Sequence, residues 1–159
     1  MRRIKQADPT GCGLACIAML ASSDYNNVRE VAIKQLGFND SGTFHTSTKD
    51  LRELARKFKI ELGKRRRKFK RFEGLPETAI LAINHMDASD TWHWVVYRRR
   101  SNDTFVYDPK KSIKTNKRRD FGHIKARWYL PVIGTYKANA LGQQKAPLLV
   151  PRRSAFYCR

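Results

Sequence analysis

A glutamine, a cysteine, a histidine and an aspartate occur along this chain in an arrangement that fits nucleophilic catalysis by a thiol. Gln6 precedes Cys12 by six residues, and His93 and Asp108 follow far downstream. In such a set the thiolate attacks a carbonyl carbon, the imidazole moves the proton and the carboxylate orients the imidazole, while the carboxamide donates to the oxyanion. The combination predicts a cysteine endopeptidase that works through a thioester acyl-enzyme.

Cys12 lies where an apolar helix is expected to begin. The positive end of the helix dipole and the unpaired N–H groups of the first turn favour a thiolate there. Its neighbours Gly11 and Gly13 are expected to bind substrate, because they would let a peptide backbone come close to the sulfur. Cys16, one turn further along the apolar face, is expected to pack in the core, and Cys158 is given no role.

His93 lies between two tryptophans on a segment that alternates like a strand. A hairpin centred between residues 100 and 101 would place His93 directly opposite Asp108, with a slip of one or two residues if the turn is centred later. Trp92 and Trp94 are expected to contact the substrate. The remaining histidines have no such partner and are expected to be surface or core residues: His45, His85 and His123.

Three helices followed by several strands are expected to position these residues. Helical spacing and capping signals predict helices over about 12–21, from residue 26 or 27 to a stop at Gly37, and from Ser47 with Asp50 as its capping partner. Strands are expected over 60–62, 78–84, 91–99, 103–107 and 124–132. Helices first and sheet afterwards is an α+β order. We expect one domain over 1–136 and a C-terminal extension or tail over 137–159.

The net charge of +19, from 33 Lys+Arg against 14 Asp+Glu, is extreme. Such a charge attracts nucleic acid, anionic membrane or an acidic protein, although it would equally keep the protein in solution. The expected polyanion-binding residues lie in two runs: Lys64, Arg65, Arg66, Arg67 and Lys68, and Lys110, Lys111, Lys117, Arg118 and Arg119. The alternative function is therefore a nucleic-acid-acting effector or toxin nuclease, which would gain nothing obvious from an activated thiol.

Several classes of cofactor and location are disfavoured by the sequence. Cys12 and Cys16 lack a second pair of ligands at zinc spacing, so no metal or other cofactor is expected. The longest apolar run, 14–21, is too short to span a bilayer, and the basic N-terminus lacks the apolar core of a secretory signal. Cys12 and Cys16 share a helix in a geometry that forbids a disulfide, which favours reduced thiols. These features predict a cytoplasmic protein.

In segments 6–15, 93–96 and 108–109 the chain resembles the bacteriocin-leader peptidases. These are papain-like cysteine peptidases, usually the N-terminal domain of peptide-exporting ABC transporters, which cleave after a double-glycine leader. The resemblance covers about residues 4–132. It implies Cys12 as nucleophile, His93 as general base and acid, Asp108 as orienting residue and Gln6 as oxyanion donor.

The same resemblance implies a helical half that carries the cysteine, packed on an antiparallel sheet that carries the histidine and aspartate. Gly11 departs from the family pattern, because an acidic residue commonly precedes the cysteine there. No transporter follows in this sequence, so coupling to export would need a separate partner.

Overall fold

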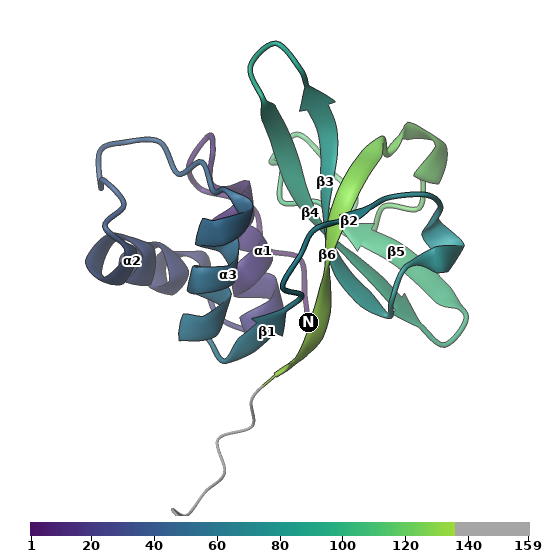
Figure 1. Cartoon of the computed structure of the whole chain (residues 1–159), viewed down its shortest axis with the longest axis horizontal. Coiled ribbons are helices and arrows are strands. Elements are labelled where there is room, and N and C mark those ends of the chain that lie inside the picture. Colours follow the sequence, from purple (N-terminus) through teal and green to yellow (C-terminus); the bar gives the residue numbers. More distant parts are fainter. Residues whose placement is uncertain (136–159) are drawn as a thin grey trace, which may run out of the picture.

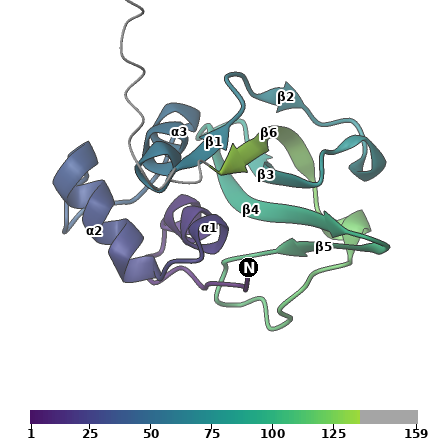
Figure 2. The same ribbon diagram turned by 90° about the horizontal axis from the view of Figure 1, so that it is seen from below.

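The computed structural model describes residues 1–135, which form a helical half and a sheet half lying side by side (Figure 1). The expected extension over 137–159 lies outside the described residues. The helical half contains α1 (Cys12–Ala21), α2 (Tyr25–Leu36) and α3 (Thr48–Lys57). Figure 2 shows α1 between α2 and the sheet, so the helix that begins with Cys12 lies at the seam of the two halves.

The helices begin and end where the capping chemistry of the sequence places them, with one exception. At α3, Ser47 accepts from the Asp50 N–H while Asp50 accepts from the Ser47 N–H, which is the predicted capping box. The chain leaves α2 at Gly37, which has a φ of 74° that glycine tolerates. The predicted start of α2 at residue 26 or 27 is wrong, because Asp24 caps this helix by accepting from the Asn27 N–H at 2.8 Å.

Six antiparallel strands form the other half of the molecule. They are β1 (Ile60–Leu62), β2 (Arg67–Lys68), β3 (Thr78–Met86), β4 (Thr91–Arg100), β5 (Asp103–Tyr107) and β6 (Ala126–Thr135), with short 3₁₀ turns at Phe72–Gly74 and Phe121–His123. The strand order is β1-β6-β3-β4-β5, and β2 pairs with β6. The predicted α+β architecture is therefore confirmed, although the last strand begins two residues later than expected and runs on to Thr135.

The alternation of β4 separates two apolar clusters on opposite faces of the sheet. Trp94 and Val96 pack in the cluster that includes all three helices, whereas Val95 and Tyr97 belong to a second cluster on the other face. This division matches the faces predicted from the alternating pattern. Because α1 packs on the first face, Cys12 is brought against the strand that carries His93.

The β4–β5 hairpin is centred one residue later than 100–101, which shifts the pairing across the two strands by two residues. Arg100 pairs with Asp103 and Val96 pairs with Tyr107, so Ser101 and Asn102 form the turn. Ser101 adopts a φ of 52° there, a left-handed conformation typical of tight hairpin turns. The direct pairing of His93 with Asp108 is therefore wrong by two residues, and the two side chains meet diagonally from neighbouring strands.

Over the described part of the chain, the three helices are all too short or too polar to cross a membrane.

Candidate active site

The sulfur of Cys12 lies at the first turn of α1, facing β4. Cys12 is 8% exposed, and the backbone N–H of Trp94 points at its Sγ atom at 3.5 Å. The first bond within the helix runs from the Ala15 N–H to the Gly11 carbonyl, so no helical carbonyl accepts the N–H groups of Cys12 and Gly13. Free N–H groups and the positive end of the helix dipole thus surround the sulfur.

His93 forms the link between the sulfur and Asp108. Its Nε2 atom lies 2.7 Å from Oδ1 of Asp108, a hydrogen bond between residues fifteen positions apart. Burial opposes the charged imidazole, yet the Asp108 hydrogen bond and the neighbouring Cys12 side chain outweigh it and raise the pKa of His93 to about 9. At neutral pH the imidazole is therefore protonated beside the sulfur.

Asp108 is 2% exposed, and both of its carboxylate oxygens have partners. Oδ1 also accepts from the Lys110 N–H at 3.0 Å, and Oδ2 accepts from Nη1 of Arg118 at 2.7 Å. Burial alone would raise the pKa of Asp108, but the hydrogen bond and charge of His93, the Lys110 N–H and Arg118 together lower it. A buried carboxylate is thus kept ionised by its neighbours.

Arg118 differs from its expected role. Its side chain is 9% exposed and pairs with Asp108 on one edge and with Asp120 at 2.8 Å on the other. The expectation that Arg118 binds a polyanion at the surface is wrong, because its guanidinium is committed to two carboxylates inside the protein. The sequence holds one weak signal for this pairing, the alternation of Arg118 with Asp120 two residues later.

Gln6 is buried close to the site, but its carboxamide is engaged elsewhere. Nε2 donates to the carbonyls of Asp8 at 3.0 Å and Pro9 at 2.7 Å, so both of its protons hold the loop before Cys12. Within residues 1–135 no donor reaches its buried Oε1 atom. In this conformation the expected donation from Gln6 to an oxyanion is absent, and the first-turn N–H groups are the available donors.

The two glycines beside Cys12 are explained by internal packing. A methyl group at Gly11 would lie 1.8 Å from the Tyr25 hydroxyl oxygen, and one at Gly13 would lie 2.0 Å from Oγ1 of Thr46. Both residues are buried. These glycines let α1 pack tightly against its own protein neighbours, which gives them a structural reason, and close approach of a substrate backbone stays a prediction.

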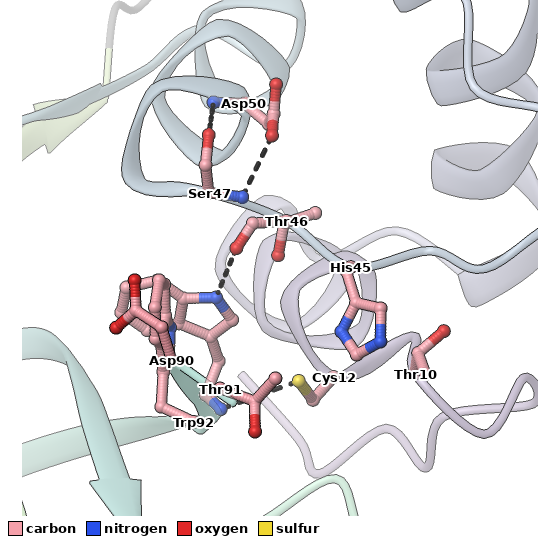
Figure 3. Close-up of a pocket in the computed structure, with 10 residues that line it drawn as sticks. Thr10, Cys12, His45, Thr46, Ser47, Asp50, Asp90, Thr91 and Trp92 are labelled. Carbon is pink, nitrogen blue, oxygen red and sulfur yellow. Dashed lines mark hydrogen bonds between the residues drawn. The ribbon is translucent and has the colours of Figure 1, made fainter. Parts of the chain in front are cut away.

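Two cavities adjoin the site. One of about 260 Å³ is lined by Cys12 together with His45 and Trp92, and the other, of about 480 Å³, is lined by His93 and Asp108. Figure 3 shows the sulfur in the wall of the first cavity, with His45 and Thr10 on one side and Thr91 and Trp92 on the other. A substrate chain that crossed the sulfur would have space on both sides.

The two tryptophans beside His93 have different positions. Trp92 is partly buried and lines both cavities, so it remains a candidate contact for substrate. The Trp94 indole is 1% exposed and donates from Nε1 to the Thr46 carbonyl at 3.0 Å. The indole packs in the core, while Trp94 also lines the cavity that holds Cys12, so substrate contact by Trp94 stays a prediction.

Arg3 was missed by sequence reasoning, although it organises the loop that carries Asp108. Its guanidinium donates to the carbonyls of Asp108 at 2.5 Å, Lys110 at 2.7 Å, Ile113 at 2.7 Å and Thr115 at 3.1 Å. An arginine near a chain end gives no local signal for contacts with residues more than a hundred positions away. The N-terminal segment thus fixes the backbone on which the buried carboxylate depends.

Cys16 packs in the core behind the site. Cys16 is fully buried, and this burial, with the nearby Cys12 and Asp108 charges, raises the pKa of its thiol, as expected for a packing residue. Over the part of the chain that the structure describes, no three His, Cys, Asp or Glu side chains gather in a way that could hold a metal ion.

Comparison with known proteins identifies the family. The model of the Peptidase C39 family matches residues 1–130. The peptidase domain of Streptococcus ComA, a bi-functional ABC transporter involved in a quorum sensing pathway, is similar with a TM-score of 0.56 at 20% identity, over 81% of this chain and 95% of that chain. A double glycine motif protease from an AMS/PCAT transporter, solved with the leader peptide, has a TM-score of 0.52 at 17% identity, over 81% and 88%.

At these identities the two structures show that the fold is shared. A search of curated proteins finds no match. Because the family model covers most of the chain, from residue 1 to residue 130, this protein belongs to the Peptidase C39 family and is a cysteine peptidase.

Proposed function

We propose that this cysteine peptidase is an endopeptidase in which Cys12 is the nucleophile, His93 moves the protons and Asp108 orients the imidazole. The observation that carries the proposal is the 2.7 Å bond between His93 and Asp108, together with the closeness of Cys12, which helps to raise the pKa of the imidazole. The cavities on both sides of these residues support access for an extended peptide.

The protonated His93 defines the starting state of the proposed reaction. The Cys12 thiolate attacks the scissile carbonyl carbon, and the carbonyl electron pair moves to oxygen, where the N–H groups at the start of α1 stabilise it. The tetrahedral intermediate collapses to a thioester as the C–N bond breaks and His93 gives its proton to the leaving amine. His93 then takes a proton from water, which hydrolyses the thioester and releases the thiolate. Gln6 would assist the oxyanion only after its carboxamide turns from the Asp8 and Pro9 carbonyls.

The proposed substrate is a precursor peptide cut after a pair of small residues, with double glycine as the leading candidate. Cys12 is 8% exposed and Trp92 forms part of the wall of the cavity beside it, which favours small side chains next to the scissile bond. The similar structures named above come from a double glycine motif protease and a transporter peptidase domain, which supports the same class. A reduced thiol is needed for this chemistry, and the cytoplasm supplies that condition.

The experiment is a cleavage assay combined with thiol labelling. A thiol-directed peptidase inhibitor at neutral pH should form one adduct on Cys12, located by mass spectrometry, and block cleavage of a peptide with Gly-Gly before the scissile bond. Replacing that pair by Val-Val should abolish cleavage, and Cys12→Ala should lose it while Cys16→Ala, a matched control within the same helix, retains it. Full cleavage by Cys12→Ala would sink the proposal.

A further inference from the structure

We propose that Arg118 is a positioning residue of the active site, which holds the Asp108 carboxylate in the orientation that His93 requires. The inference rests on the proposed function, because it concerns the same imidazole and carboxylate. Arg118 does not face the scissile bond in this proposal; it acts through Asp108.

The two oxygens of Asp108 are held by different groups. His93 and the Lys110 N–H take Oδ1, and Nη1 of Arg118 takes Oδ2 at 2.7 Å. A carboxylate fixed at both oxygens cannot rotate about its own axis without losing one partner. Loss of Arg118 would leave only the Oδ1 contacts, so the plane of the carboxylate would no longer be set against the imidazole ring.

The fold places Arg118 there through the backbone as well as the side chain. Arg118 and Val106 exchange two backbone hydrogen bonds, at 2.8 and 2.9 Å. Val106 lies near the end of β5 and two residues before Asp108, so these bonds hold residue 118 beside the carboxylate. Nε and Nη2 of Arg118 bind the two oxygens of Asp120 at 3.0 and 2.8 Å. Asp120 therefore fixes the orientation in which the guanidinium presents Nη1 to Asp108.

The charges around Asp108 show why an arginine is needed. His93 on β4 and Cys12 on α1 lie on one side, Arg118 and then Asp120 lie on the other, and Arg3 contacts the Asp108 carbonyl from the N-terminal segment. Asp108 is 2% exposed, so a lost ion pair would leave its charge poorly solvated. A buried carboxylate without this partner would take up a proton or turn away, and in either case it would support the His93 imidazolium less.

The test measures kcat, KM and the pH dependence of cleavage for the full chain with the Gly-Gly peptide. Arg118→Met should lower kcat about tenfold or more with KM changed less than about twofold, because the interaction acts on the reacting groups rather than on binding. The high-pH limb of kcat/KM should also move, because the carboxylate that supports the His93 imidazolium is no longer held in place. Arg52→Met is the matched control: it removes another internal arginine, bonded to the Gly63 carbonyl at 2.8 Å, and should leave the pH profile unchanged.

Arg118→Lys keeps the inference testable if the methionine variant does not fold. Lysine keeps the charge but cannot donate to both Asp108 and Asp120 as a planar fork, so kcat should fall several-fold and the high-pH limb should move in the same direction by a smaller amount. Folded Arg118→Met or Arg118→Lys protein with an unchanged kcat and pH profile would overturn the inference. Failure of the proposed function is a separate result, because it would appear as cleavage by Cys12→Ala whatever the arginine variants do.

Discussion

The two basic runs of this protein look alike in sequence and differ in the contacts that their side chains make. Lys64, Arg65, Arg66, Arg67 and Lys68 are all exposed, and within residues 1–135 none of them makes an ion pair or a side-chain hydrogen bond. The run from Lys110 to Arg119 wraps around the site instead. Arg118 pairs with Asp108, Lys111 donates to the Ala7 carbonyl at 3.1 Å, and Lys117 and Arg119 both pair with Asp103.

Whether the side chains of a basic run pair within the protein or stay free for a partner thus depends on the acidic residues packed nearby, not on the density of positive charge. Asp103, Asp108 and Asp120 flank the second run in sequence and in space, whereas the first run lies on the edge strand β2 and its preceding loop. Among residues 1–135, the side chains of the first run make one specific contact, Arg66 over the Trp128 ring at 4.7 Å. Its charges remain available to a polyanionic or acidic partner, while most of those in the second run serve the fold.

The largest effect is expected when the second run loses its hydrogen bonds to the N-terminal segment. Arg3→Ala removes four hydrogen bonds from a charged group to the carbonyls of residues 108–115, and should lower the free energy of unfolding by about 2 kcal/mol. Peptide cleavage should fall with it, because the backbone of Asp108 loses its support. Chemical denaturation and kcat/KM check both effects. Arg2→Ala, one residue earlier and exposed, is the control and should behave like the wild type.

The titration of His93 reports on the second run, because Arg118 of that run contacts Asp108, the partner of His93. Its pKa of about 9 exceeds the ordinary 6.5, so the stabilisation it gives is fully present below about pH 6.5 and is lost as the pH rises through about 9. Cleavage should decline over the same upper range, as the proton for the leaving amine is lost. NMR titration of the ring should give a lower pKa in Cys12→Ala, because the cysteine contributes to the shift. An unchanged value would mean that sulfur and imidazole do not interact.

The smallest effect on the enzyme is expected from the first run. Replacing Lys64, Arg65, Arg67 and Lys68 by glutamine should change the free energy of unfolding by no more than about 0.5 kcal/mol per residue and leave kcat unchanged. The protein should nevertheless elute from heparin at lower salt, since these charges face solvent. A large loss of kcat in this variant, measured with the Gly-Gly peptide, would mean that the first run also belongs to the site.

Much of the fold was predictable because its signals are local. The capping box of Ser47 and Asp50, the stop at Gly37 and the alternation around Trp94 each depend on a few neighbouring residues, and each has the predicted form. The meeting of His93 with Asp108 needed only a hairpin, and a register error of two residues did not prevent it. Short-range chemistry is what a single sequence records best.

The features that were missed depend on contacts between distant segments. The sequence does not reveal that Gly13 packs against Thr46, that Arg3 binds the loop after Asp108, or that Arg118 points inward. Gln6 shows a related limit, since its type fits an oxyanion donor while its hydrogen bonds are decided by the turn of the loop before Cys12. Each of these contacts depends on which segment of the folded chain lies next to the residue, and the local sequence does not specify that neighbour.

The contacts of Arg3 span between 105 and 112 residues, which bears on how the enzyme matures during synthesis. A ribosome delivers the arginine more than a hundred residues before its acceptors, so the loop cannot be fastened until those acceptors have emerged. Contacts of such long range also slow folding, because a large loop must close before they form. The proposed hydrolytic centre would thus remain without this support on the nascent chain until the segment after Asp108 has been made.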